Sequence, residues 1–351
     1  MVALFLTSFY FDAKAPSSIA IVSTTANTTG QPKLPGYVWT AFAQNTLLYP
    51  PRLQPFPHWN QIPYLDHPTR LLMCWIPKSA CTQIKVLFIK KQLKKLNFSL
   101  YDGNNGIHTN YEMISKLEHY SQPRDGHIWT NSSWSRWALV RDPIKRFVSG
   151  FVDKCGPHGY SITKNKSNCF GCLGDLSCFV ESSFRNLAMV SRDGLHYYTL
   201  HWDHFYPQFW FCDFEHRLQS FTTIFTYDSS EEFKDLFRES LLRQGWPDEI
   251  IETSWGPNHT EPYLSETTSH DSSIGEKHFL MEEIKSNLTL TDVLVRTYFI
   301  DFMAFQFPFP HWIASLCKLQ KSSEDAGRFF VCRLNQYIET FHLKKWTHVV
   351  V

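Results

Sequence analysis

Three stretches of the chain share one pattern, an almost wholly apolar run followed by a segment with helical spacing. The runs are LLMCWI at 71–76, WALVR at 137–141 and TTIFTYD at 222–228. Strands that are apolar along their whole length are typical of parallel sheets, which helices cover on both faces. The pattern therefore predicts an α/β fold with a central parallel sheet and flanking helices.

Capping residues mark the ends of two of the expected helices. Asp142 and Pro143 supply an N-cap and a proline at the first helical position, and this helix is expected to run from about 143 to 154. The segment 229–245 begins with serine, has acids in its first turn and ends in glycine. Periodicity predicts further helices near 84–95, 178–189, 276–286, 291–305 and 329–343.

Composition indicates a globular protein with little net charge. The chain has 351 residues, of which 43% are hydrophobic, enough to bury a substantial core. Its formal net charge is +1, which gives no reason to expect nucleic acid or an anionic membrane surface as the main partner. An anionic ligand would have to be held by local charges.

Cysteines and glycosylation sequons indicate the compartment. Five of the nine cysteines cluster in and after an insertion at about 155–178, and they are Cys155, Cys169, Cys172, Cys178 and Cys212. Asn-x-Ser/Thr sequons begin at Asn27, Asn97, Asn131, Asn165, Asn258 and Asn287. Together they favour an oxidising, glycosylating lumen in which the cysteines form disulfides. Because five is odd, one is expected to pair elsewhere, with Cys317 or Cys332; a zinc site that includes His158 is the alternative.

The loop after the first apolar run reads PKSACT at 77–82 and lies between a buried strand and a helix. Backbone N–H groups converge on an anion at such a position, and Lys78 adds a charge while Thr82 adds a hydroxyl. The sequence lacks the Gly-x-x-x-x-Gly-Lys-Ser/Thr motif of nucleoside-triphosphate sites, so a Mg-bound triphosphate is not the expected ligand. The alternative reading is a tight turn with a solvated lysine.

A second motif follows the second run, where Arg141 ends the strand and Ser149 lies two turns into the next helix. Both side chains can reach one phosphate, the arginine through its planar fork and the serine through its hydroxyl. By itself, Arg-Asp-Pro at the end of a strand is as often a salt-bridged cap. The indication of a bound anion comes from the pair of motifs.

The two motifs resemble the binding signatures for 3′-phosphoadenosine 5′-phosphosulfate (PAPS) of Golgi carbohydrate sulfotransferases, the class that includes chondroitin and HNK-1 enzymes. The resemblance rests on IPKSACT and VRDPIKRFVSGF and extends through DKC, CFGC, HFYPQFWFC and YFIDFMAF, which are similar to a divergent, nematode-type branch. It implies a P-loop-like sulfotransferase fold. It covers about 67–310, which leaves 1–66 as an N-terminal stem and 311–351 as a tail without an assigned role.

The resemblance also implies how the donor is bound and where the protein works. The residues implied for the 5′-phosphosulfate are Lys78, Ser79, Ala80, Cys81 and Thr82, and those for the 3′-phosphate are Arg141 and Ser149. Lys78 would also stabilise charge on the leaving phosphate. We expect a glycan acceptor, no metal and no nucleic acid. The Golgi lumen is the expected location, with a type II membrane anchor or, without one, secretion; the apolar run at 1–11 is too short to span a bilayer.

The acceptor hydroxyl needs a base, which is sought among 16 histidines. We favour His127, which precedes the strand that ends in Arg141 and matches a Gly-His element of related hexuronic-acid sulfotransferases; a surface histidine is the alternative. His204 is the second choice, and the candidate contacts of the acceptor are His201, Asp203 and His204. Two other functions stay open. One is a pseudoenzyme that binds a glycan or nucleotide without turnover, and the other is a kinase that needs ATP and magnesium.

Overall fold

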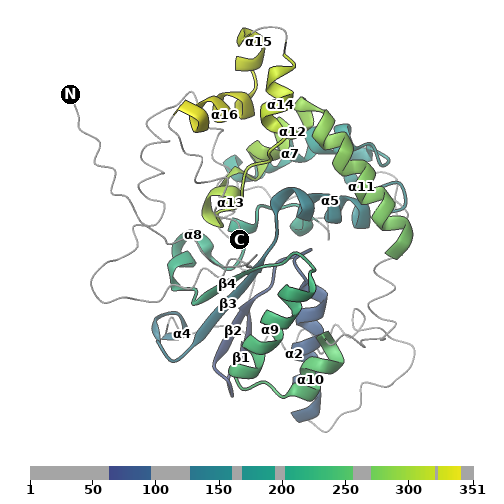
Figure 1. The fold of residues 1–351 in the computed structure, drawn as a ribbon. Coiled ribbons are helices and arrows are strands. Elements are labelled where there is room, and N and C mark those ends of the chain that lie inside the picture. Colours follow the sequence, from purple (N-terminus) through teal and green to yellow (C-terminus); the bar gives the residue numbers. More distant parts are fainter. Residues whose placement is uncertain are drawn as a thin grey trace, which may run out of the picture.

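The computed structural model describes residues 63–95, 127–159, 168–193, 202–255, 270–320 and 323–340. At the centre of the described part lies a four-stranded sheet with helices packed on it (Figure 1). Its strands, in spatial order, are β1 (Tyr64–Asp66), β2 (Leu71–Cys74), β3 (Ser135–Val140) and β4 (Thr223–Thr226). The predicted α/β fold class is confirmed.

The three apolar runs form neighbouring parallel strands. β2 pairs in parallel with β3, and β3 pairs in parallel with β4. β1 pairs antiparallel with β2, so the sheet is mixed. The sequence pattern does not reveal β1, because three residues are too few for a periodic or continuous apolar run to stand out. Since parallel strands end at the same edge, the residues after β2, β3 and β4 come together there.

Alternate residues of the strands pack into two different cores. Leu71, Met73 and Leu139 face one core, whose helices are α2 (Cys81–Lys95), α9 (Glu231–Arg243) and α10 (Asp248–Trp255). Leu72 and Val140 face the other core. The remaining α-helices of the described residues are α4 (His127–Thr130), α5 (Pro143–Lys154), α7 (Leu176–Asp193), α8 (Phe214–Arg217), α11 (His270–Ser286), α12 (Leu288–Thr297), α13 (Phe299–Ala304), α14 (Ile313–Lys318), α15 (Ser323–Gly327) and α16 (Phe330–Thr340).

The capping signals in the sequence mark real helix ends. Asp142 accepts a hydrogen bond from Lys145 N at 2.8 Å at the start of α5, and this helix has the predicted bounds. Ser230 Oγ accepts from Phe233 N at 3.1 Å at the start of α9. Gly245, just beyond α9, has a φ of 84°, a left-handed conformation that glycine adopts without steric cost.

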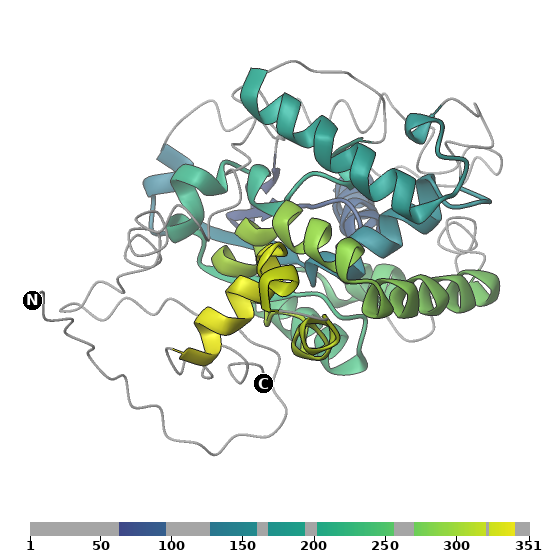
Figure 2. The ribbon, with the colours of Figure 1, turned by 90° about the horizontal axis from the view of Figure 1, so that it is seen from above.

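Helix α5, which carries the second motif, lies between α7 and α11 (Figure 2). Phe151 of α5 packs on Phe179 of α7, with ring centroids 5.3 Å apart. The described part of the C-terminal tail, α14 to α16, belongs to the same core, because Val331 N donates to Asp292 Oδ1 of α12 at 2.8 Å. Other helices therefore pack against α5 on several sides.

Eight of the nine cysteines form four disulfides, and the pairs are Cys74–Cys212, Cys155–Cys169, Cys172–Cys178 and Cys317–Cys332. Two pairs close the insertion, as disulfides were expected to do. The expectation that the odd cysteine pairs with Cys317 or Cys332 is wrong, because these two pair with each other. Cys212 instead reaches the end of β2, across a sequence separation of 138. Oxidised sulfurs cannot serve as thiolate ligands, which removes the zinc alternative for this cluster.

Candidate active site

The loop after β2 has an unusual backbone conformation. Lys78 and Ala80 have φ values of 68° and 58°, in the left-handed region that costs a residue with a Cβ roughly 1–2 kcal/mol. Between them, Ser79 is fully buried, and its N–H donates to Ile76 O at 3.0 Å. A strained backbone of this kind persists where surrounding contacts hold it, and functional sites are where such strain gathers.

Two arginines of the second motif hold this loop. Arg146, fully buried in α5, donates from Nε to Pro77 O at 2.8 Å. Arg141 donates from Nη1 to Lys78 O at 3.0 Å. Hydrogen bonds from a charged donor are stronger than neutral ones, so these two bonds fix one motif to the other. Sequence reasoning did not single out Arg146, whose signal was a basic residue on the apolar face of an amphipathic helix.

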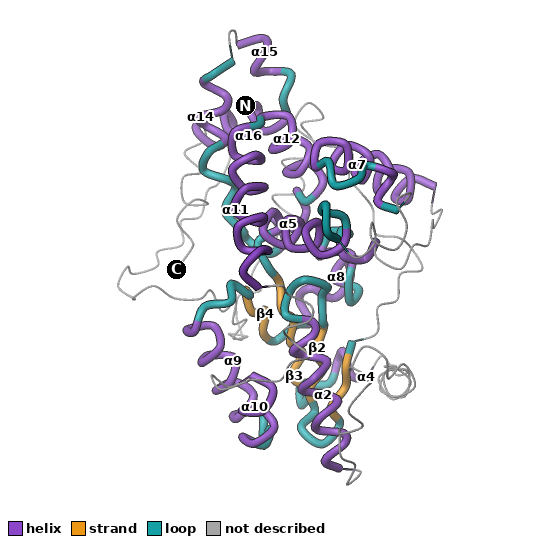
Figure 3. Tube along the Cα trace, turned by 90° about the vertical axis from the view of Figure 1, so that its right-hand side faces the viewer, coloured by secondary structure: helices purple, strands orange, loops and turns teal. Residues whose placement is uncertain are grey.

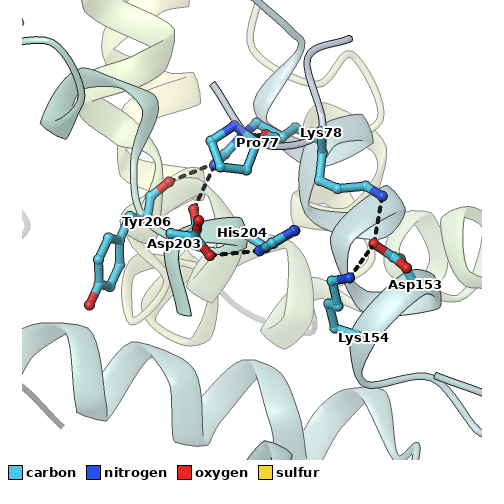
Figure 4. Close-up of polar contacts among 8 residues, drawn as sticks. Pro77, Lys78, Asp153, Lys154, Asp203, His204 and Tyr206 are labelled. Carbon is cyan, nitrogen blue, oxygen red and sulfur yellow. Dashed lines mark hydrogen bonds and ion pairs between the residues drawn. The ribbon is translucent and has the colours of Figure 1, made fainter. Parts of the chain in front are cut away.

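Arg146 also fixes the segment that carries His204. Its other two nitrogens donate to Tyr206 O at 2.7 Å and to Asp203 O at 3.2 Å. The carbonyl groups of Pro77, Asp203 and Tyr206, which Figure 4 labels, all accept hydrogen bonds from this one guanidinium. Arg146 therefore sets the position of the loop at 77–82, called the donor loop below, relative to His204.

Gln208 and Asp301 make a second buried link. Gln208 Oε1 accepts from Arg141 N at 2.8 Å and from Ser79 Oγ at 3.4 Å, and its Nε2 donates to Arg141 O at 2.7 Å. Asp301, fully buried in α13, accepts from the backbone N–H groups of Gln208 and Phe209 at 2.8 and 2.9 Å. Burial raises the pKa of Asp301 to about 6, although these two bonds favour its ionised form. Gln208 thereby connects the backbone of Arg141 to α13.

Lys78 is held in an ion pair at the C-terminal end of α5. Its Nζ lies 2.8 Å from Asp153 Oδ2, and Lys154 Nζ lies 3.1 Å from the same oxygen. Burial alone would raise the pKa of Asp153, but the two lysines lower it to about 2. Asp153 is therefore a carboxylate at any physiological pH, and it orients the lysine that the first motif supplies.

His204 lies beside the same lysine pair. Its Nδ1 is 2.7 Å from Asp203 Oδ1, and Figure 4 shows its ring between Asp203 and the group formed by Lys78, Asp153 and Lys154. Burial lowers the pKa of His204 against the opposing effect of Asp203, and the positive charges of Lys154 and Lys78 lower it further. The imidazole is consequently neutral near pH 7, with its orientation set by a carboxylate.

Arg141 retains capacity to bind an anion. Its Nε is buried and has no hydrogen-bond partner in the described part of the chain, and its guanidinium lies 5.4 Å from the ring centroid of Tyr227 after β4. A buried N–H donor without a partner costs free energy, so this side chain keeps an unused capacity to donate a hydrogen bond. The donor set at this edge of the sheet thus fits a phosphorylated ligand.

The structure brings most of the predicted site residues together. The donor loop, Arg141, Asp203 and His204 meet at the carboxyl edge of the parallel strands. Ser149 is buried in α5, and no hydrogen bond among the described residues links it to Arg141, so its role stays a prediction. His201 lies outside the described residues.

His127 is not brought to this edge. It begins α4 and is exposed, and α4 is fixed near the first residues of β3, where Arg136 Nη1 donates to Ile128 O at 3.3 Å and to Asn131 O at 2.9 Å. Arg141, in contrast, follows the last residue of β3. The length of the strand therefore separates His127 from Lys78, and its assignment as the base gains no support from the geometry.

Fold and site together define an α/β protein with Lys78, Arg141 and a neutral His204 at the carboxyl edge of its parallel strands. The chain belongs to the sulfotransferase family, whose model matches residues 64–308. An uncharacterized Caenorhabditis elegans protein is 27% identical over 269 residues, which are 71% of this chain and 72% of that protein. The predicted resemblance to a nematode-like branch of carbohydrate sulfotransferases is confirmed by two further relatives.

These two relatives match shorter parts of the chain. The candidate sulfotransferase vep-2 of C. elegans is 33% identical over 125 residues, 35% of this chain and 38% of its own length. The carbohydrate sulfotransferase chst-1 of C. elegans is 24% identical over 182 residues, 50% of this chain and 53% of its own length. No solved structure gives a significant match. In the described ranges there is neither a helix able to cross a bilayer nor a group of three or more metal-ligating side chains.

Proposed function

We propose that this sulfotransferase moves a sulfuryl group from PAPS to a hydroxyl group of a glycan. The observation that carries the proposal is the joining of the two motifs, because Arg141 and Arg146 hydrogen-bond to the carbonyls of Lys78 and Pro77. A single anionic nucleotide can touch both motifs only if they meet in this way. The name of chst-1, a carbohydrate sulfotransferase, supports a glycan as the acceptor.

The donor's two anionic ends would be held by different groups. Lys78 and the backbone N–H groups at the start of α2, with Thr82 in its first turn, suit the 5′-phosphosulfate. Arg141, whose Nε is buried without a described partner, suits the 3′-phosphate, and Ser149 is assigned to the same phosphate. The donor supplies the activated sulfuryl group. Ser79, Ala80 and Cys81 contribute the shape of the loop.

The chemical step would be an in-line displacement at sulfur. His204 accepts the proton of the acceptor hydroxyl while that oxygen forms its bond to sulfur. Lys78 stabilises the negative charge that the leaving phosphate gains as its bond to sulfur breaks. Asp203 holds the imidazole by its Nδ1 at 2.7 Å, which leaves Nε2 as the basic nitrogen. The proposed contacts of the acceptor are His201, Asp203 and His204.

The titration of the purified protein with 3′-phosphoadenosine 5′-phosphate, the product nucleotide, tests this proposal. We expect binding at micromolar or lower concentration in the presence of a chelator, and no comparable binding of ATP with or without magnesium. Failure of the folded protein to bind the bisphosphate would refute the assignment of PAPS as the donor. Binding without transfer to any glycan would indicate the inactive, ligand-binding alternative.

The choice of base is tested by a matched pair of variants. We expect His204→Gln to lower the transfer rate by about 10²- to 10⁴-fold, the usual contribution of a general base, with nucleotide affinity retained. His127→Gln, in an exposed histidine, should leave the rate unchanged. The pKa of His204 lies below the usual 6.5, so its neutral, basic form persists below pH 6.5. The transfer rate should therefore fall only when the pH drops below this lowered pKa. The opposite ranking of the two variants would restore His127 as the base.

The Golgi lumen is the proposed location, with a type II membrane anchor. Disulfides and sequons support an oxidising, glycosylating compartment. Asn131 and Asn287 are the two sequons within the described ranges, and the others lie outside them.

A further inference from the structure

Helix α5 contains a glycine in its interior, at a position where alanine would favour the helix. Gly150 is buried in α5, which is otherwise well formed, with a capping Asp142 and a proline at its start. Glycine loses more backbone freedom on folding than any other residue, so it is a poor choice inside a helix. The reason for a glycine here lies in what packs against it.

The segment that carries His204 packs directly on Gly150. A Cβ at this position would lie 3.2 Å from Phe205 Cε1 and 3.3 Å from His204 O. Carbon atoms in ordinary contact are about 3.5–4.0 Å apart, so the neighbours of an added methyl group would have to move by a few tenths of an ångström. Gly150 thus allows the backbone of His204 to come this close to α5.

The ring of Phe205 has little room to move. It is buried, and its centroid lies 5.8 Å from that of Phe147 and 4.8 Å from that of Phe179. The carbonyl of Phe205 accepts a hydrogen bond from Tyr298 Oη at 2.9 Å. Close-packed side chains transmit a displacement rather than absorb it. A methyl group on Gly150 would therefore act on the backbone at His204 as well as on the ring.

The backbone on both sides of His204 is held by α5 itself. Arg146, one turn before Gly150 on the same face of the helix, donates to Asp203 O at 3.2 Å and to Tyr206 O at 2.7 Å. These hydrogen bonds draw the segment onto α5, and the bare backbone of Gly150 fixes how near it comes. The two residues together determine where His204 lies.

The same helix holds the lysine of the donor loop. α5 begins just after β3, and Figure 3 shows it lying beyond the ends of the strands. Asp153, three positions after Gly150, pairs with Lys78 at 2.8 Å. α5 is therefore a common support for Lys78 and His204, and the close approach at Gly150 contributes to their separation.

We propose that Gly150 is a positioning residue for the transfer reaction, which sets the distance of His204 from Lys78. This inference rests on the proposed function, in which His204 is the base and Lys78 faces the leaving phosphate. A misplacement of about 1 Å can cost about 10²-fold in rate. A displacement of a few tenths of an ångström should accordingly lower the rate less, by about threefold to tenfold.

The test compares Gly150→Ala with the unchanged protein. We expect a transfer rate from PAPS about threefold to tenfold lower, with the affinity for 3′-phosphoadenosine 5′-phosphate within about twofold. The unfolding temperature should stay close to that of the unchanged protein, because the better helix former offsets the strain. Gly275→Ala is the matched control in α11, where an added Cβ would meet nothing within 4 Å, and it should change neither rate nor affinity.

A double-mutant cycle with His204→Gln separates positioning of the base from a general structural effect. In the His204→Gln background, Gly150→Ala should lower the rate no further, because the base that it displaces is already absent. If Gly150→Ala does not fold, the comparison is made in a Phe205→Leu background, which removes the ring atom that lies 3.2 Å from the added Cβ.

The outcomes distinguish this inference from the proposed function. A normal rate in Gly150→Ala, an equal loss with and without His204, or a loss of nucleotide affinity would each overturn the role of Gly150 and leave the proposed function standing. A normal rate in His204→Gln alone would instead overturn the proposed base, and the inference would fall with it.

Discussion

Replacing Lys78 by alanine should abolish sulfuryl transfer and leave the protein folded. Lys78 is the cation of the loop that faces the proposed leaving phosphate, and its loss removes the charge that stabilises the departing oxygen. Loss of one such preorganised group costs about 10²- to 10³-fold in rate, and a charged group should lie at or above the upper end of that range. The transfer of labelled sulfate from PAPS to a mixed glycan acceptor measures the effect.

The fold should survive because little depends on the Lys78 side chain. Its ion pair with Asp153 is partly exposed, with 19% of the lysine side chain accessible, and Lys154 remains 3.1 Å from the same carboxylate. Alanine has a Cβ as lysine does, so it neither adds nor relieves strain at a φ of 68°. An unchanged unfolding temperature is the control, and transfer at the normal rate would remove Lys78 from the mechanism.

Replacing Arg141 by alanine should weaken nucleotide binding by roughly 2–4 kcal/mol, the cost of removing one partner of a buried charged contact. That corresponds to a dissociation constant about 30- to 1,000-fold higher. Arg141→Lys should not restore binding. A lysine cannot donate to Lys78 O and engage a phosphate through a planar fork at the same time.

The assignment of Arg141 to the 3′-phosphate has its own measurement. The unchanged protein should prefer 3′-phosphoadenosine 5′-phosphate over adenosine 5′-phosphate, which lacks the 3′ group. In Arg141→Ala this preference should shrink, because the variant has lost the partner of that group alone. If the variant binds both nucleotides more weakly by the same factor, Arg141 acts only by holding the loop at Lys78. An unchanged affinity for the bisphosphate would contradict both roles.

Local signals in the sequence were sufficient for the elements that carry the two motifs. The bounds of α5 follow from Asp142 and Pro143, since a capping carboxylate and an N-terminal proline act within one helical turn. The parallel strands follow from continuous apolar runs, because burial on both faces leaves no polar alternation. The placement of both motifs at one edge of the sheet then follows from the topology alone.

The parts that escaped prediction depend on contacts between distant positions. Gln208 is held by Asp301, and nothing within a few residues of either indicates the other. Cys212 finds Cys74 rather than a neighbour in the insertion. His127 and His204 cannot be ranked without knowing which end of β3 each one occupies. A polar residue within an apolar segment of the sequence is the signal that could have indicated such buried contacts. Gln208 and Asp301 are both residues of that kind.

The order in which the chain leaves the ribosome gives the Asp301 link a further meaning. Asp301 supports the turn at Gln208, which in turn holds both Ser79 and the backbone of Arg141. The donor loop is made early in synthesis, yet the residue that completes its support is made more than 200 positions later. A nascent chain that stops short of α13 lacks this support. Nucleotide should therefore stabilise only chains extended past that helix, and cannot assist the earlier steps of folding.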